Sequence, residues 1–277
     1  MNAVLPSGPL GGALLVLAPH FDDEVLGCGG LLAGLEDKAA VRVVIACDGR
    51  GSAEWRRPAP VPGAPDISAV RRAESIAALG LLGIAESQVS TLGFPDGTLA
   101  ARDRELALAL EQLVEELNPR YILAPFRFDR HPDHMALGRA ALSLPAVKEG
   151  RAALIEYFVY VRFRLFPGGD IRRVVKPEFR QRRDLADVAF LKRRALDCFA
   201  TQVTRFFPWQ TRPVLTEAAL RESAAGPEEY LVAPPGAADA AVLRWPVWLV
   251  RGILAVESRL KRAAYVWRLK RRCGRKT

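Results

Sequence analysis

The sequence predicts an α/β fold, a mostly parallel β-sheet flanked by helices. Short apolar runs typical of buried strands alternate with longer stretches of helical periodicity, which is the pattern of βαβ units. Half of the 277 residues are hydrophobic and 26% are charged, which excludes a wholly disordered chain, a collagen-like fibre and a coiled coil. A chain of this length can bury a sizeable core without disulfide bonds.

The first 144 residues contain four strand–helix pairs. Strands are predicted for apolar runs at 13–19, 41–46, 90–93 and 120–125. Helices are predicted after these runs at 24–36, 67–82, 102–117 and 132–144. The first helix opens with Asp22-Asp23-Glu24, whose charges suit the positive end of a helix dipole. Because strands and helices alternate, we expect a Rossmann-like arrangement.

Beyond residue 150 the pattern is mixed. Residues 156–164 alternate between apolar and polar types, which predicts a strand, and 170–176 is a second strand candidate. A helix is expected at 186–200. The stretch Arg180–Arg183 is expected to be an exposed loop.

The positive charge of the chain is concentrated at its C-terminus. The formal net charge is +9, yet residues 242–277 hold eleven Lys or Arg and one acidic residue, Glu257. The preceding 241 residues are therefore close to neutral. An enzyme of nucleic acids usually carries a basic surface around its site, so we expect no nucleic-acid partner.

The same C-terminal segment has the pattern of an amphipathic helix. Apolar residues recur at steps of three or four: Trp245, Leu249, Ile253, Val256, Leu260, Ala264 and Trp267. Such a helix, with basic residues beside tryptophans, lies in the plane of a membrane. We expect residues 242–277 to contact an anionic membrane surface, the alternative being a terminal helix packed on the domain.

The compartment follows from the cysteines and from the N-terminus. The four cysteines are widely spaced, which suits a reducing environment. The sequence shows no secretory signal and no apolar stretch of 18 residues. We therefore expect a cytoplasmic protein, peripheral on the cytoplasmic face of the membrane.

The three histidines of the chain indicate a metal site. His20 ends the first predicted strand, and His131 and His134 follow the strand at 120–125. In an open parallel sheet, ligands bind at the carboxyl ends of the strands. A histidine, a carboxylate close behind it and a remote second histidine leave one position of a zinc ion open, as in catalytic sites. Of Asp22 and Asp23, one is expected to bind the ion and the other to act as general base.

At these residues the sequence resembles the LmbE/PIG-L family of zinc-dependent N-acetylglucosamine deacetylases. The family motif is His-Pro-Asp-Asp-Glu followed by a distant His-Pro-Asp-His, and this chain has His20–Glu24 and His131–His134 in that order. The resemblance extends from about residue 13 to residue 205. Phe21 replaces the usual proline, and we expect this change to alter a pocket wall without loss of the site.

The resemblance implies a division of roles among the motif residues. His20, Asp23 and His134 would bind one Zn²⁺ ion, and Asp22 would take the proton from the metal-bound water. His131, as imidazolium, would stabilise the oxyanion and protonate the leaving amine.

Three further positions carry family roles by the same resemblance. Asp133 would orient His131, whereas Arg71 and Asp96 match positions at which the family holds the sugar.

These observations predict a deacetylase domain at 1–241 followed by a basic amphipathic C-terminal helix within 242–277. The expected reaction is metal-dependent hydrolysis of the N-acetyl amide of an N-acetylglucosamine-type amino sugar in a lipid-linked glycoconjugate. The alternatives are a soluble small-molecule glycoside as substrate, or a non-catalytic sugar- or nucleotide-binding α/β module.

Overall fold

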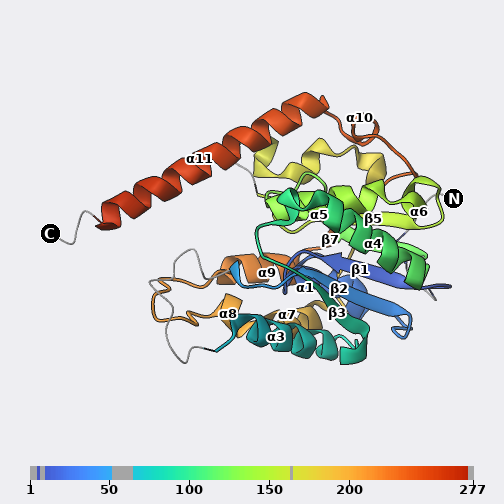
Figure 1. Ribbon diagram of the computed structural model, residues 1–277, viewed down its shortest axis with the longest axis horizontal. Coiled ribbons are helices and arrows are strands. Elements are labelled where there is room, and N and C mark those ends of the chain that lie inside the picture. The colour runs from blue at the N-terminus through green and yellow to red at the C-terminus, as the bar shows by residue number, and fades with distance from the viewer. Residues whose placement is uncertain (1–4, 7–9, 52–64, 163–164, 274–277) are drawn as a thin grey trace.

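The protein contains one seven-stranded, mostly parallel sheet (Figure 1). The structure is a computed structural model that describes residues 5–6, 10–51, 65–162 and 165–273, with side chains up to residue 260 except that of Pro167. The strands are β1 (Leu14–Ala18), β2 (Val41–Cys47), β3 (Val89–Phe94), β4 (Tyr121–Pro125), β5 (Ala153–Tyr157), β6 (Arg180–Arg183) and β7 (Glu228–Val232). Their order across the sheet is β3-β2-β1-β4-β5-β7-β6, and only β7 runs antiparallel to its neighbours.

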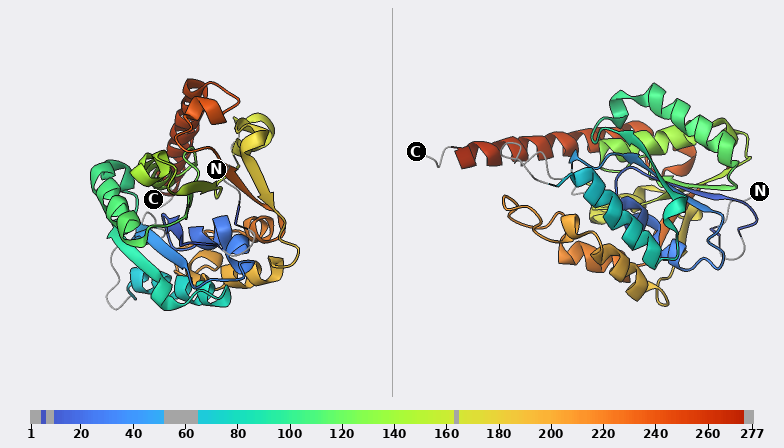
Figure 2. Two further views of the ribbon diagram at one scale, coloured as in Figure 1. Left: turned by 90° about the vertical axis from the view of Figure 1, so that its right-hand side faces the viewer. Right: turned by 60° about the horizontal axis from the view of Figure 1, so that its bottom comes forward.

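Helices cover both faces of the sheet, so the fold has three layers (Figures 1 and 2). One face is covered by α4 (Asp103–Leu117) and α5 (Pro132–Ser143). The other is covered by α1 (Asp23–Ala33), α3 (Ile67–Leu81), α7 (Ala189–Asp197) and α9 (Glu217–Ala225). Shorter helices are α6 (Pro145–Lys148), α8 (Ala200–Val203) and α10 (Asp239–Val242).

Strand β1 lies inside the sheet, between β2 and β4, and contributes to both cores. Leu14 pairs with Val41 of β2 on one side and with Tyr121 of β4 on the other. Side chains alternate between faces along a strand, so Val16 joins the core under α1 and α3 while Leu17 joins the core under α4 and α5. Burial on both faces explains why this strand is a continuous apolar run rather than an alternating one.

The predicted α/β class is confirmed, and so are the four strand–helix pairs before residue 144. The prediction after residue 150 is partly wrong. Strand β5 ends at Tyr157, and residues 171–174 form a 3₁₀ turn in place of the predicted strand, because the Asp170 side chain accepts the Arg172 N–H at 2.9 Å and begins a helical turn. The stretch Arg180–Arg183 is an edge strand instead of a loop, paired with β7, which had not been predicted.

Helix α1 is interrupted at Cys28, whose backbone angles (φ −142°, ψ 16°) are not helical. The glycines on both sides of the break allow close packing. A side chain at Gly27 would collide with the ring of Tyr157, and one at Gly30 would collide with Leu185. Close packing therefore explains this glycine-rich stretch.

The predicted C-terminal helix is present as α11 (Val247–Cys273). The residues before it, Val242 and Leu243, are buried, and so is Val250 within it, all in a third core that includes Phe126 and Phe166. The domain boundary at 241/242 stays a prediction, but the start of the basic segment contributes to this core. Among the helices that the structure describes, none is long and apolar enough to cross a membrane.

Candidate active site

The predicted site residues meet at the carboxyl edge of the parallel strands. The contributing segments follow β1 (His20, Asp22 and Asp23), β3 (Asp96) and β4 (His131, Asp133 and His134). The three histidine rings are mutual neighbours, with centroids 4.8 to 5.4 Å apart. The sheet topology thus brings together residues that lie more than 100 positions apart in the sequence.

Three of these side chains converge on one point. Asp23 Oδ2 lies 3.0 Å from His20 Nδ1 and 3.0 Å from His134 Nε2. His134 is fully buried, yet neither of its ring nitrogens makes a hydrogen bond in the part of the chain that the structure describes. A buried imidazole without a hydrogen bond, next to a carboxylate and a second imidazole, fits a zinc ion in ligand type and number. The predicted ligand set is therefore brought together.

Two carboxylates hold the other nitrogen of His20. Asp96 Oδ1 and Asp133 Oδ2 lie 3.0 and 3.1 Å from His20 Nε2. A carboxylate on the outer nitrogen fixes the tautomer and direction of a metal-binding histidine, so that Nδ1 faces Asp23. The turn after β3 in turn fixes Asp133, which accepts the N–H groups of Gly97 at 2.8 Å and Leu99 at 3.0 Å.

This arrangement differs from the role expected of Asp133. Its Oδ2 lies 3.9 Å from His131 Nδ1, farther than from His20. The His131 ring instead caps α5, because Nδ1 accepts the backbone N–H of Asp133 at 3.3 Å. Because Nδ1 of His131 accepts this hydrogen bond, the proton of the neutral ring is on Nε2, the nitrogen that does not cap the helix.

The imidazolium form expected of His131 during the reaction stays a prediction. Burial, together with the nearby His20 and His134, lowers the pKa of His131 to about 4. In the metal-free site His131 is therefore a neutral donor through Nε2–H.

Asp22 lies beside the ligand set in a strained backbone conformation. Its φ of 120° is in the region that favours glycine, and its N–H donates to Glu24 at 2.9 Å. Burial raises its pKa to about 8, while the positive charge of Arg71 opposes this shift. A carboxylate with a pKa near neutrality suits a general base.

Arg71 stabilises this strained segment by binding backbone groups around it. It donates to the carbonyl oxygens of Phe21 and, at 3.3 Å, of Gly49, and its guanidinium lies 3.5 Å from Asp22 Oδ2. Only 2% of Arg71 is exposed. Its predicted contact with a sugar, like that of Asp96, stays a prediction, and the contacts observed for both residues are with the site itself.

Asp129 is a site residue that sequence reasoning missed. Its Oδ1 accepts the N–H groups of Arg130 and, at 3.1 Å, of His131, and lies 3.5 Å from His134 Nδ1. Its Oδ2 accepts the N–H of Tyr160 at 3.2 Å. Asp129 thus links the second predicted histidine ligand to the segment after β5. Its place two residues before His131 is the one signal that could have indicated it.

Tyr160 was also missed, and it forms part of the wall of the site. Its ring centroid lies 5.3 Å from that of His134 and 6.4 Å from that of His131. The side chain is 38% exposed, so a ligand can reach it. No sequence motif connects it to the histidines, because it follows a different strand.

Cys47 is close to the site. Its sulfur lies 3.9 Å from Asp133 Oδ2, within a group that includes His20 and Asp96. Burial raises the pKa of its thiol to about 11, so in the metal-free site Cys47 is a neutral thiol.

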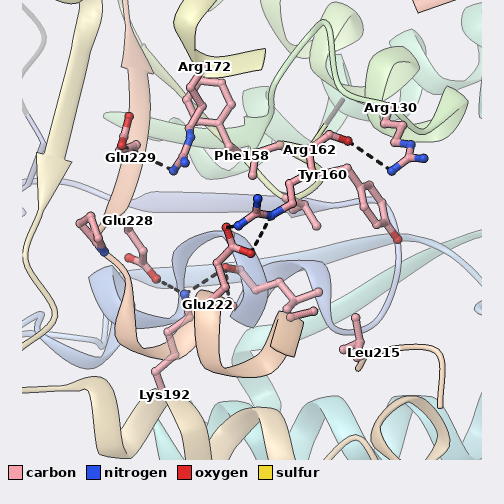
Figure 3. A pocket seen from close by; sticks show the side chains of 17 residues that line it. Arg130, Phe158, Tyr160, Arg162, Arg172, Lys192, Leu215, Glu222, Glu228 and Glu229 are labelled. Atoms are coloured by element: carbon pink, nitrogen blue, oxygen red, sulfur yellow. Dashed lines mark hydrogen bonds and ion pairs between the residues drawn. The ribbon is translucent and has the colours of Figure 1, made fainter. Parts of the chain in front are cut away.

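A cavity of about 230 Å³ opens beside Tyr160 (Figure 3). Tyr160 and Arg130 lie at one end and Lys192 with Glu228 at the other. Apolar groups such as Leu26 and Val161 share its lining with ion pairs, one of which joins Arg162 to Glu222 through two contacts of 2.8 and 3.0 Å. The cavity can therefore accept a ligand with both polar and apolar parts.

Comparisons with known proteins agree with the fold. Residues 15–144 match the family described as PIG-L: GlcNAc-PI de-N-acetylase. A probable N-acetyl-alpha-D-glucosaminyl L-malate deacetylase 2 of Bacillus cereus is 33% identical over 132 residues, which cover 47% of this chain and 59% of that protein. The chain thus spans less than two thirds of this relative's length.

Solved structures share the architecture at lower sequence identity. The A40926 pseudoaglycone deacetylase Dbv21 aligns with a TM-score of 0.58 at 24% identity, covering 82% of this chain and 99% of the other. The 4-carboxy-2-hydroxymuconate hydratase GalB of Pseudomonas putida KT2440 aligns with a TM-score of 0.53 at 17% identity, covering 82% and 98%. Because a deacetylase and a hydratase share this architecture, these likenesses show the fold and not the reaction. The family match thus covers residues 15–144, just under half of the chain, and this range includes both histidine motifs.

Proposed function

We propose that this chain is a metal-dependent N-deacetylase of an N-acetylglucosamine-type amino sugar. The observation that carries the proposal is the convergence of His20, Asp23 and His134 beside Asp22, whose pKa is raised to about 8. Two imidazoles and one carboxylate leave a coordination position open for water or substrate. When bound, a zinc ion supplies a Lewis acid for an amide carbonyl and for water.

The residues of the chain have distinct parts in this proposal. Asp22 takes a proton from the water that attacks the acetyl carbon and passes it to the leaving nitrogen. His131 donates its Nε2–H to the oxygen on which negative charge develops. The carbon–nitrogen bond breaks, and the products are acetate and the free amine.

The supporting residues act by orienting the ligands. Asp96 and Asp133 hold His20, Asp129 lies against His134, and Arg71 holds the backbone around Asp22. These contacts preorganise the site, which lowers the cost of reaching the reactive geometry.

The names of related proteins support the substrate class. One is named for N-acetylglucosaminyl malate and another for a glycopeptide pseudoaglycone, and both names describe deacetylases. In our proposal the cavity beside Tyr160 receives the group attached to the amino sugar. We infer that this group belongs to a lipid-linked glycoconjugate, because the basic amphipathic segment at 242–277 suits work at a membrane.

The test is product analysis by mass spectrometry. Zinc-loaded protein is incubated with N-acetylglucosaminyl lipids, N-acetylglucosaminyl nucleotides and soluble N-acetylglucosaminides, and the Asp22→Asn protein serves as the matched control. We expect loss of 42 mass units, the difference between acetyl and hydrogen, from the lipid-linked substrate with the parent protein alone. Turnover of soluble glycosides alone would replace the lipid-linked assignment, and binding without turnover of any substrate would favour a non-catalytic sugar-binding module.

A further inference from the structure

Among the side chains that the structure describes, helix α11 packs on the domain through its first turns. Val250 is fully buried, and Val247, Ile253 and Leu254 pack against the third core. Glu257 is 5% exposed, and its Oε1 accepts the N–H of Leu165 at 2.8 Å. The attached face therefore extends from Val247 to Glu257.

The other faces of the same turns carry large apolar side chains in solvent. Trp248 is 73% exposed, Val256 47% and Leu260 57%. The apolar stripe predicted from the sequence is thus divided, because Ile253 packs on the domain while Val256 and Leu260 do not. Exposed apolar residues that cluster next to basic residues indicate an interaction surface.

Apart from Glu257, every charged residue of α11 is basic. Glu257 is the one acidic residue between 242 and 277, and its Oε1 accepts a backbone N–H of the domain. Arg251 and Arg259 are exposed on the described part of the helix, Arg251 within an ion pair of 3.0 Å with Asp239, and nine further Lys or Arg lie in the same segment of the sequence. This pattern is complementary to an anionic surface.

The direction of α11 relates this surface to the site. In Figure 1 and in the right-hand view of Figure 2, the helix extends past the edge of the sheet at which α3 and α5 begin. That edge holds the histidines and carboxylates of the candidate site. A flat partner bound along the far part of α11 would therefore face the catalytic edge.

We propose that α11 docks on the surface of a bilayer that contains anionic lipids. Trp248, Val256 and Leu260 enter the headgroup region, and the basic residues contact the lipid phosphates. This docking places the enzyme on the cytoplasmic face of the membrane with its site towards the lipid. The docking itself does not depend on the proposed deacetylation, but the benefit for a lipid-linked substrate does.

The test is co-sedimentation of the full chain with vesicles. Vesicles of phosphatidylcholine alone are compared with vesicles of equal parts phosphatidylcholine and phosphatidylglycerol. The test variant is Arg268→Gln/Arg271→Gln/Arg272→Gln, and the control, Arg104→Gln/Lys148→Gln/Arg151→Gln, removes the same charge from exposed positions of the domain. One basic residue near an anionic surface changes partitioning about fivefold, so we expect the test variant to bind roughly 100-fold more weakly than the control. A Trp248→Ser variant is expected to bind several-fold more weakly.

Three results would overturn the docking proposal. They are equal binding to neutral and anionic vesicles, equal binding by the two charge variants, and retardation of DNA in a gel by a protein that does not sediment with vesicles. Deacetylation of a detergent-solubilised N-acetylglucosaminyl lipid is measured in parallel with the parent protein and the same two variants. This assay contains no bilayer, so a lack of activity in all three proteins would contradict the proposed function without changing the interpretation of the vesicle binding.

Discussion

Asp133 and His20 lie 113 residues apart in the sequence, and the Oδ2 of the first is 3.1 Å from the Nε2 of the second. Asp133 is fully buried and accepts two backbone N–H groups from the turn after β3. The contact turns the opposite nitrogen of His20 towards Asp23. The His-Pro-Asp-His motif therefore supports both proposed histidine ligands, because its Asp133 orients His20 and its last residue is His134.

Replacing Asp133 is expected to weaken metal binding. Asp133→Asn removes the charge that fixes His20, and loss of such an outer carboxylate typically costs 10–100-fold in metal affinity. Zinc affinity is measured by competition with a chromophoric chelator, and Asp187→Asn, at an exposed position, is the control. Unchanged zinc affinity together with a slower reaction would instead support the role first expected of Asp133, the orientation of His131.

Replacing a ligand is expected to remove the metal altogether. His134→Ala takes away one of the two nitrogens that face Asp23, so zinc content should fall from one per chain to a small fraction of that value. His131→Gln is the matched control, because His131 caps α5 and is not in the proposed ligand set. Metal content is read by inductively coupled plasma mass spectrometry after dialysis. Full occupancy in His134→Ala would rule out the ligand set.

Replacing the proposed base is expected to separate metal binding from turnover. Asp22→Asn keeps the size of the side chain and removes its basicity, and general acid–base groups contribute about 10²–10⁴-fold in rate. The variant should hold zinc and turn over at least ~100-fold more slowly. A rate close to that of the parent protein would mean that another group takes the proton.

The part of the fold that the sequence predicts well is the part with clear periodicity. Strands β1, β2 and β4 are buried on both faces, so they are visible as apolar runs, and the helices after them have regular spacing. The predicted strands also indicated where the site lies, because the two histidine motifs follow β1 and β4. The carboxyl ends of parallel strands meet at one edge of the sheet, so the strand positions alone predict that His20 lies near His134.

The parts that could not be predicted depend on contacts between distant segments. Strand β6 is Arg-Gln-Arg-Arg, which has no apolar alternation, and it forms opposite the acidic end of β7, where Arg180 lies 3.8 Å from Glu229. Asp129 and Tyr160 were missed because their roles arise only when β4 and β5 are adjacent. The burial of Arg71 could not be predicted either, because it depends on how α3 packs.

The interruption of α1 is held by a buried ion pair. Glu228 accepts the N–H groups of Gly30 at 2.6 Å and Leu31 at 2.7 Å, which follow the break at Cys28. Lys192 donates to Glu228 at 2.7 Å and to the carbonyl of Leu26, which precedes the break, at 3.0 Å. The pair thus satisfies backbone groups on both sides of the break that the helix itself leaves unpaired.

Breaking this pair is expected to destabilise the protein strongly. In Lys192→Met the Glu228 carboxylate stays buried without its partner, and such a change costs about 3–5 kcal/mol of the free energy of unfolding. Lys192→Met/Glu228→Gln should be less destabilised than the single variant, because the lone charge is removed as well. Urea unfolding measures both, and Lys148→Met, at an exposed lysine, should change stability by less than about 0.5 kcal/mol. A small effect of Lys192→Met would show that water reaches the pair.

The buried groups of the site also predict how stability depends on pH when no metal is bound. Burial lowers the pKa of His134, but Asp23 and Asp129 raise it more, to about 9. A folded-state pKa above the ordinary value of about 6.5 stabilises the fold fully below pH 6.5, and this contribution is lost as the pH rises through 9. Burial also raises the pKa of Asp22, to about 8, and a raised carboxyl pKa likewise makes stability fall as the pH rises towards 8.

Both groups therefore act in the same direction between pH 6.5 and about pH 8, and His134 continues the trend to about pH 9. We expect the melting temperature of chelator-treated protein to decrease across this range, and His134→Gln, which removes the titrating ring, to flatten the decrease. Zinc should reverse the trend, because it binds the deprotonated ligands and displaces protons, so the rise in melting temperature that zinc produces should grow with pH. Thermal unfolding at pH 6, 7, 8 and 9, with and without one equivalent of zinc, measures both effects. A melting temperature that rises with pH in the chelator-treated protein would contradict the pairing of a charged His134 with Asp23.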